Sequence, residues 1–107
     1  MGFVAITATI HKLKFDDVEK RLQELGVPGL SVSETKGYGA YKNFYQHDWM
    51  GPYARLQLYV PEADGERIAR AILEAAHTGL DSDGILAITP VSRLYRISDK
   101  REIRADE

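Results

Sequence analysis

The sequence contains no cysteine, only one tryptophan and no long apolar run. The absence of cysteine excludes a disulfide framework, a cysteine zinc site, a thiol nucleophile and thiol redox chemistry. No apolar stretch approaches the ~18 residues that span a bilayer, and the first residues show neither a basic region nor a cleavage site. We therefore expect a cytoplasmic protein without membrane insertion. The formal net charge of -2 removes the main electrostatic signature of a nucleic-acid partner.

The 107 residues are 44% hydrophobic and 28% charged, which are the proportions of a globular chain. This length suits one domain, residues 1–107, and no linker or low-complexity segment divides it. A single short domain buries a modest core, so oligomerisation stays open. One stretch is rich in aromatic side chains, namely Tyr38, Tyr41, Phe44, Tyr45, Trp49 and Tyr53.

The spacing of apolar residues predicts the element order βαββαβ. Strands are expected over 3–10, 30–38, 53–60 and 85–88, and helices over 15–25 and 68–76, closed by Gly26 and Gly79. The continuous apolar run 85–88 is typical of a central buried strand. Residues 40–52 are expected to form a loop and 98–107 a loose end. This order indicates a ferredoxin-like α+β fold, an antiparallel four-stranded sheet with two helices on one face.

The candidate chemical groups are scattered. His11, His47 and His77 fall at a strand end, in the loop and at a helix end, without the close spacing of a metal site. The Gly-x-Ser-x-Gly motif of a nucleophile elbow is also missing. We find no catalytic constellation, and we expect a protein that is not an enzyme and holds no metal.

Two glycine-containing segments are more informative. Gly37-Tyr38-Gly39 ends a predicted strand, where glycine lets the backbone approach a ligand. Residues 78–84 form a polar turn before the last strand, and its N–H groups suit an anion. An ordinary strand end and an ordinary helix stop explain the two segments equally well.

Several segments together resemble the PII signal-transduction family. Residues 29–39 resemble its second-strand signature, 75–84 the loop after its second helix, and 93–97 its C-terminal basic stretch. The opening of the first helix, 14–18, is similar as well. The resemblance covers nearly the whole chain. It implies a homotrimer that binds an adenine nucleotide between subunits and signals to a protein target through the loop after the second strand. This T-loop corresponds to about residues 40–52.

The resemblance also implies which residues contact the nucleotide. Gly29 and Ser31 would face the base, and Thr9, Leu58 and Tyr59 would wall the adenine. The backbone of Gly37, Tyr38 and Gly39 would hold the ribose and nearby phosphate. The remaining phosphate contacts would come from Ser82, Asp83 and Gly84, with Arg96 reaching across from the neighbouring subunit. The mixed outer face of the sheet would then line the interior of the trimer.

Three positions depart from the family pattern. Ile85 replaces a basic residue, Ser98 replaces a second arginine, and Ala40-Tyr41 stands where a glutamine helps hold magnesium and the triphosphate. Each lost charge-assisted contact removes about 1.5–3 kcal/mol. We therefore predict that ADP or AMP is favoured over MgATP.

The T-loop is also shorter than in standard PII proteins, and neither Tyr41 nor Tyr45 matches the family's modifiable tyrosine. Such a loop is similar to that of the carboxysome-associated branch, which senses adenine nucleotides together with bicarbonate. On this resemblance, Lys42, Asn43 and His47 are candidate contacts for bicarbonate or for a partner. A transporter and a metabolic enzyme are both compatible targets.

Two alternatives share the predicted element order or its trimer architecture. A divalent-metal-binding trimer of the cation-tolerance type would need clustered ligands, and the histidines are scattered. An acylphosphatase-like enzyme would need a glycine-arginine phosphate loop, which residues 10–14 lack. Nucleotide, metal and acyl-phosphate assays distinguish the three hypotheses.

Overall fold

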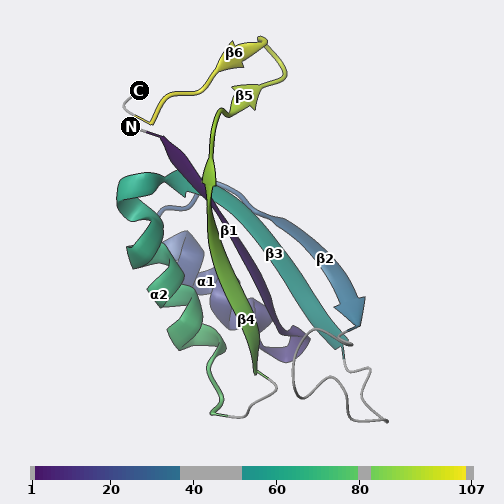
Figure 1. Ribbon diagram of the computed structural model, residues 1–107. Coiled ribbons are helices and arrows are strands. Elements are labelled where there is room, and N and C mark those ends of the chain that lie inside the picture. The colour runs from purple at the N-terminus through teal and green to yellow at the C-terminus, as the bar shows by residue number, and fades with distance from the viewer. Residues whose placement is uncertain (1, 37–51, 80–82, 106–107) are drawn as a thin grey trace.

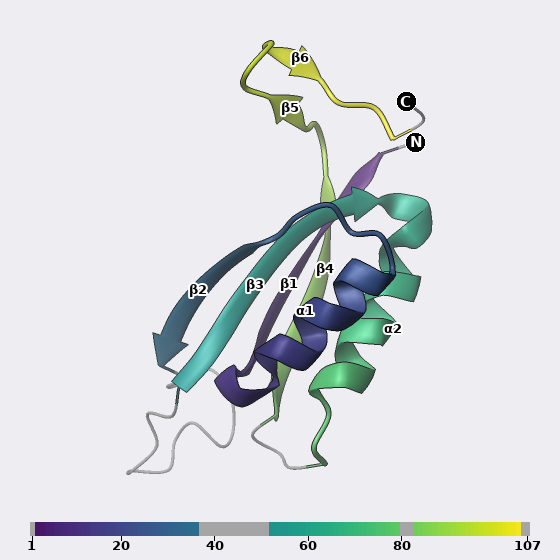
Figure 2. The ribbon, with the colours of Figure 1, turned by 180° about the vertical axis from the view of Figure 1, so that it is seen from behind.

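The computed structural model describes residues 2–36, 52–79 and 83–105. An antiparallel sheet in the order β2-β3-β1-β4 carries two helices on one face, and a two-stranded hairpin follows it (Figure 1, Figure 2). This arrangement confirms the predicted ferredoxin-like α+β fold. The elements are β1 (Phe3–His11), α1 (Phe15–Glu24), β2 (Ser31–Lys36), β3 (Pro52–Pro61), α2 (Gly65–Ala76), β4 (Gly84–Val91), β5 (Tyr95–Arg96) and β6 (Arg101–Glu102), with 3-10 turns at Lys12–Lys14 and Glu62–Asp64.

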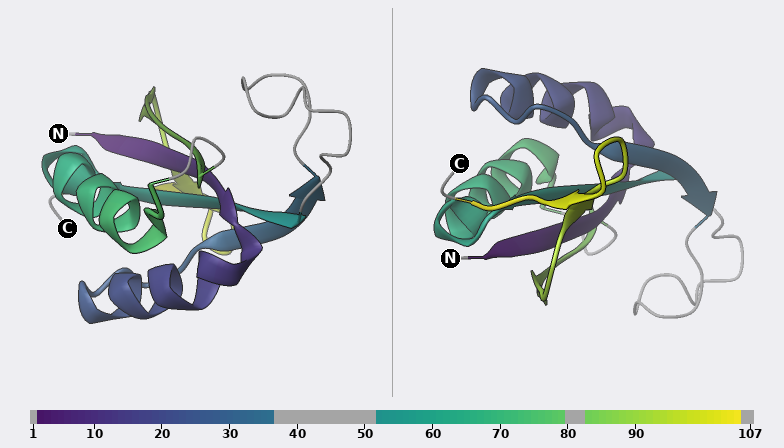
Figure 3. Two further views of the ribbon diagram at one scale, coloured as in Figure 1. Left: turned by 90° about the horizontal axis from the view of Figure 1, so that it is seen from below. Right: turned by 90° about the horizontal axis from the view of Figure 1, so that it is seen from above.

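The core lies between the sheet and the helices. Alternation in β1 sends Val4, Ile6, Ala8 and Ile10 to the helix face, and all four are buried. Helix α1 contributes Val18 and Leu22, and α2 contributes Ile68, Ala69, Ile72 and Ala76. The two helices contact each other on this face, and the end-on views show the twist of the sheet (Figure 3).

The two helices end differently. Gly26 follows α1 with a φ of 80°, the left-handed conformation that the sequence predicted for a helix stop. In contrast, α2 ends at Ala76, and His77 is already extended with φ -68° and ψ 130°. Gly79 therefore does not close α2, and its φ of 89° belongs to the following turn.

The prediction of a central buried strand at 85–88 is wrong for the single chain. Among the described residues, strand β4 lies at an edge of the sheet and pairs with β1 alone. Ile85 and Ile88 remain 47% and 36% exposed. An apolar run shows only that a strand has two apolar faces, and a partner outside the chain can cover one of them.

The expectation of a loose end from residue 98 also needs correction. Strand β6 returns to pair with β5, with Tyr95 opposite Glu102 and Arg96 opposite Arg101. The charged composition of this segment concealed the hairpin. The hairpin projects from the end of the sheet that lies opposite the start of β4 (Figure 1).

Candidate functional site

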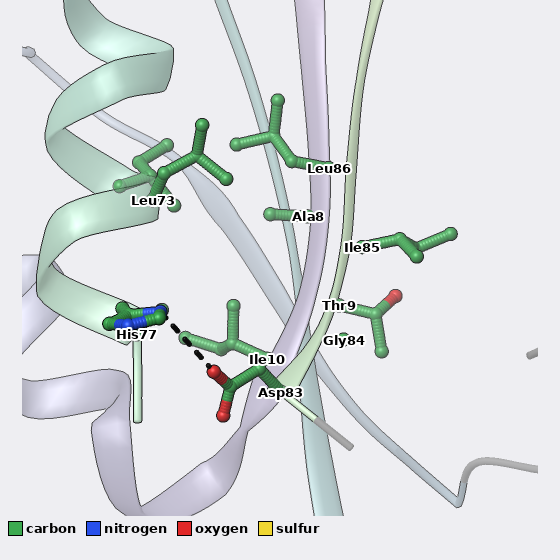
Figure 4. Close-up of a pocket in the computed structure, with 11 residues that line it drawn as sticks. Ala8, Thr9, Ile10, Leu73, His77, Asp83, Gly84, Ile85 and Leu86 are labelled. Atoms are coloured by element: carbon green, nitrogen blue, oxygen red, sulfur yellow. Dashed lines mark ion pairs between the residues drawn. The ribbon is translucent and has the colours of Figure 1, made fainter. Parts of the chain in front are cut away.

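The loop after α2 is organised around Asp83. One carboxylate oxygen of Asp83, Oδ2, accepts hydrogen bonds from the backbone N–H of Thr78 at 2.8 Å and of Gly79 at 3.0 Å. The other oxygen, Oδ1, accepts from the Thr78 hydroxyl. His77 Nδ1 lies 3.6 Å from Oδ2 (Figure 4). The N–H groups of Thr78 and Gly79 are thus already engaged by a carboxylate of the same chain.

These contacts determine the charge state of Asp83. Burial raises the pKa of the carboxyl, but the hydrogen bonds from Thr78 and Gly79 and the adjacent His77 outweigh burial. The net effect is a pKa below the ordinary aspartate value. Asp83 is therefore ionised at neutral pH and holds the turn closed.

A small cavity lies beside this loop, between α2 and the strands β1 and β4. Its volume is about 100 Å³, and its lining includes the apolar side chains Ile10, Leu73 and Leu86 together with His77 and Asp83. Figure 4 shows Thr9 and Ile85 pointing to the other side of the strands. Pockets for small molecules usually have about 300–1,000 Å³, so this cavity alone does not enclose a nucleotide.

Gly84 is required by the backbone geometry at the start of β4. Its φ is 113°, and a Cβ atom there would lie 1.8 Å from the carbonyl oxygen of Thr9. A side chain at this position would collide with β1. Glycine is thus needed at position 84 for a structural reason. This reason applies whether or not the loop also binds a ligand.

Sequence reasoning missed a ring pair at the same end of the sheet. His11 stacks on Tyr53 with ring centroids 5.0 Å apart, because the register places them opposite each other. Tyr53 is fully buried, and burial together with the negative charge of Asp83 raises the pKa of its hydroxyl. Only knowledge of the strand register would have revealed this pair.

The residues expected to face the base lie at the opposite edge of the sheet. Gly29 and Ser31 border an open hollow of about 430 Å³, together with Gln57, Leu58 and Tyr59. Alternation along β3 sends Leu58 into the core, where it is 1% exposed, and leaves Tyr59 46% exposed on the open face. On the open face of the sheet, the side chain of Tyr59 is therefore accessible and that of Leu58 is not.

Arg96 lies in the hairpin, beyond the end of β4 that is distant from Asp83 and Gly84. Strand β4 separates it from Gly84, and a rise of about 3.3 Å per residue places Val91 about 23 Å from Gly84. The guanidinium of Arg96 pairs with Asp99 at 2.9 Å. Within one chain, Arg96 and Asp83 thus belong to opposite ends of the sheet (Figure 1).

Several expected site residues lie outside the described residues. They are Gly37, Tyr38, Gly39, Lys42, Asn43, His47 and Ser82. The others form separate groups: Gly29, Ser31 and Tyr59 near the edge strand β2, Thr9, Asp83 and Gly84 near the edge strand β4, and Arg96 in the hairpin. Strands lie about 4.8 Å apart, so β2 and β4 are about 14 Å apart across the sheet. The described part of one chain does not bring these groups together.

Metal sites and membrane spans find no support in the described part of the chain. Within the described ranges, no group of three or more His, Asp or Glu side chains is placed to hold a metal ion. No described helix combines the length and the apolar character needed to cross a membrane. The described residues therefore give no support to the metal-binding alternative.

Comparison with known proteins places the chain in a family. The family model for nitrogen regulatory protein P-II matches residues 3–101. The P-II protein of Azospirillum brasilense is 35% identical over 100 residues, which cover 86% of this chain and 88% of that protein. P-II 1 of Escherichia coli K12 is 31% identical over 105 residues, covering 91% and 93%.

A solved structure shares the fold. The crystal structure of Arabidopsis thaliana PII bound to citrate superposes with a TM-score of 0.79, with 23% sequence identity, and covers 94% of this chain and 85% of that one. The family match and the curated relatives also answer the question of enzymatic activity, since proteins of this family regulate and do not catalyse. The chain therefore belongs to the P-II family of nitrogen regulatory proteins and is a signal-transduction protein rather than an enzyme.

Proposed function

We propose that this chain is a trimeric sensor that binds ADP or AMP in preference to MgATP, in clefts between its subunits. Proteins of the family are trimers that bind adenine nucleotides and act on protein targets. The observation that carries the proposal is the separation of the candidate residues. The groups near β2 and near β4 lie at opposite edges of one sheet, so a neighbouring subunit is needed to bring them together.

The edges of the sheet support a shared site. Strand β4 exposes Ile85 and Ile88 at an edge that has no partner within the described chain. Tyr59 is exposed on the open face of the sheet. Apolar groups at an open edge favour association with another strand or chain. We propose that the open face lines the interior of the trimer.

The nucleotide preference follows from charge. The start of β4 offers Ile85 where the family pattern has a basic residue, and Ser98 stands where a second arginine is expected. Asp83 adds a negative charge beside the proposed phosphate contacts. A ligand with fewer phosphates loses fewer contacts, so AMP and ADP are affected less than MgATP.

Signalling is proposed to run through the short T-loop at about 40–52. A ligand that binds one loop conformation more tightly shifts the population towards it, and a partner reads the result. We propose a transporter or a metabolic enzyme as the target. Bicarbonate is the proposed co-ligand, with Lys42, Asn43 and His47 as its contacts.

Calorimetry tests this function directly. AMP, ADP, MgATP and cyclic AMP are titrated into the protein, each with and without bicarbonate. We expect ADP and AMP to bind more tightly than MgATP, and bicarbonate to alter at least one of these affinities. Absence of heat from every nucleotide would overturn the sensor proposal, and MgATP binding as tightly as ADP would overturn the preference.

A further inference from the structure

The guanidinium of Arg96 is held by a carboxylate of its own hairpin. Arg96 Nη1 donates to Asp99 Oδ2 at 2.9 Å. The second oxygen, Asp99 Oδ1, accepts from the backbone N–H of Arg101 at 3.1 Å. Between them, Lys100 has a φ of 59°, the single positive φ among the non-glycine residues described. This conformation is uncommon for a residue with a Cβ atom, and the two hydrogen bonds to Asp99 close the turn that contains it.

The carboxyl group of Asp99 is ionised at neutral pH. Burial raises the pKa of its carboxyl, but the hydrogen bonds from Arg101 and Arg96 and the positive charge of Arg96 outweigh burial. The net effect is a pKa below the ordinary aspartate value. The positive charge of Arg96 is therefore balanced inside the hairpin before any ligand arrives.

We propose that Asp99 is a specificity-determining residue of the nucleotide site, because its carboxylate takes an N–H group of Arg96 and sets a negative charge beside the donors that are left for a phosphate. This inference rests on the proposed function, in which Arg96 reaches into the cleft of a neighbouring subunit. Carboxylate and phosphate oxygens accept the same N–H groups of a guanidinium. A nucleotide must therefore displace Asp99 or bind the remaining N–H groups of Arg96 with the negative charge of Asp99 beside it.

The consequence depends on the number of phosphates. A displaced Asp99 remains three residues from Arg96, so its negative charge still acts on the bound ligand. Repulsion between like charges grows with ligand charge, and it is strongest for ATP without magnesium and absent for adenosine. Asp99 thus adds to the effect of Ile85 and Ser98.

The test compares the native protein with Asp99→Asn in magnesium-free buffer of low ionic strength, by calorimetry with adenosine, AMP, ADP and ATP. Asparagine retains an oxygen that can accept from Arg101, so the turn has a reason to persist. We expect the affinity for ATP to rise about two- to fivefold, the size of an exposed ion pair. The gain should decrease from ATP to AMP and vanish for adenosine. Asp99→Ser, which also offers an oxygen without charge, should behave in the same way.

Asp64→Asn is the matched control. It breaks an exposed pair with Arg67, at 3.3 Å and also three residues apart, and it changes the net charge equally. Side-chain exposure in that pair is 54% and 41%, against 57% and 39% for Arg96 and Asp99. We expect no gain in nucleotide affinity from Asp64→Asn.

Arg96→Gln completes a double-mutant cycle. The gain from Asp99→Asn should shrink when Arg96 is already glutamine, because only the direct repulsion between Asp99 and the phosphates is then left to remove. An equal gain from Asp64→Asn, a gain that is undiminished by Arg96→Gln, or a gain for adenosine would each overturn the role of Asp99. If the native protein bound none of the four ligands, the proposed function itself would fail. Native binding that is unchanged in Asp99→Asn would refute the role of Asp99 alone.

Discussion

Replacing Gly84 by alanine should destabilise the protein more than the same change at Gly26 or Gly29. The new Cβ would lie 1.8 Å from the Thr9 carbonyl oxygen and 2.9 Å from the Thr9 carbonyl carbon, so both contacts are with backbone atoms that cannot rotate away. A φ of 113° adds conformational strain, and strain of this kind contributes about 1–3 kcal/mol. Separation of β4 from β1 around Ile10 would add to it, so we expect a total loss of about 3–5 kcal/mol.

These two other glycines provide a graded comparison. Gly26 has a φ of 80°, and a Cβ added there would have nothing within 4 Å, so Gly26→Ala should lose about 1 kcal/mol through strain alone. Gly29 also has open space around it and no positive φ, so Gly29→Ala should change stability by less than about 0.5 kcal/mol.

The assay is urea unfolding followed by far-ultraviolet circular dichroism. All variants are compared at one protein concentration, because the stability of an oligomer depends on concentration. The expected order of stability is Gly29→Ala, then Gly26→Ala, then Gly84→Ala. A Gly84→Ala protein as stable as Gly29→Ala would show that the contact between β4 and β1 is not as described.

Three further predictions concern charge and association. Asp83→Asn should lower stability by about 1–3 kcal/mol at pH 7. The pKa of Asp83 in the folded protein lies below its ordinary value. The ionised carboxylate therefore stabilises the folded protein fully above the unfolded pKa, and this stabilisation is lost as pH falls through the folded pKa. The difference in unfolding midpoint between the native protein and Asp83→Asn should accordingly shrink below about pH 4. Ile88→Lys should shift the protein towards monomers in analytical ultracentrifugation, since Ile88 is 36% exposed on the helix-side face of the edge strand β4, and an unchanged trimer would remove that face of β4 from the interface. Glu34→Gln breaks the exposed 2.8 Å pair with Lys12 and should cost less than about 1 kcal/mol in thermal unfolding, with the difference vanishing in about 1 M salt.

The sequence was sufficient to predict the elements that bury one regular face. The alternation from Val4 to Ile10 buries its apolar side chains on one side only if the segment is a strand. The spacing of Val18 and Leu22 does so only if their segment is a helix. The apolar run 85–88 by itself could not place β4 at an edge, because it is equally apolar whether its second face meets this chain or another; the edge position follows from the ferredoxin-like strand order.

The candidate site was predictable only as a set of residues. The motif at 82–84 located the loop, but the closure of Thr78 and Gly79 onto Asp83 depends on side-chain rotation, which no spacing rule encodes. The hairpin was missed for a similar reason. Its turn is held by a single carboxylate, Asp99, within a segment whose charge is typical of a solvated tail.

The central claim is that two subunits build each nucleotide site, and mixed trimers test it most directly. Ser31→Tyr fills the hollow near β2, and Thr9→Tyr places a bulky ring on the proposed adenine wall beside β4, so each variant alone should bind ADP poorly. The two variants are then unfolded together in equal amounts and refolded as a mixture. About a quarter of the clefts should combine the intact β2 side of one variant with the intact β4 side of the other. The account predicts that calorimetry recovers ADP binding in that fraction of sites. A mixture that binds no more ADP than the two separate variants would contradict it.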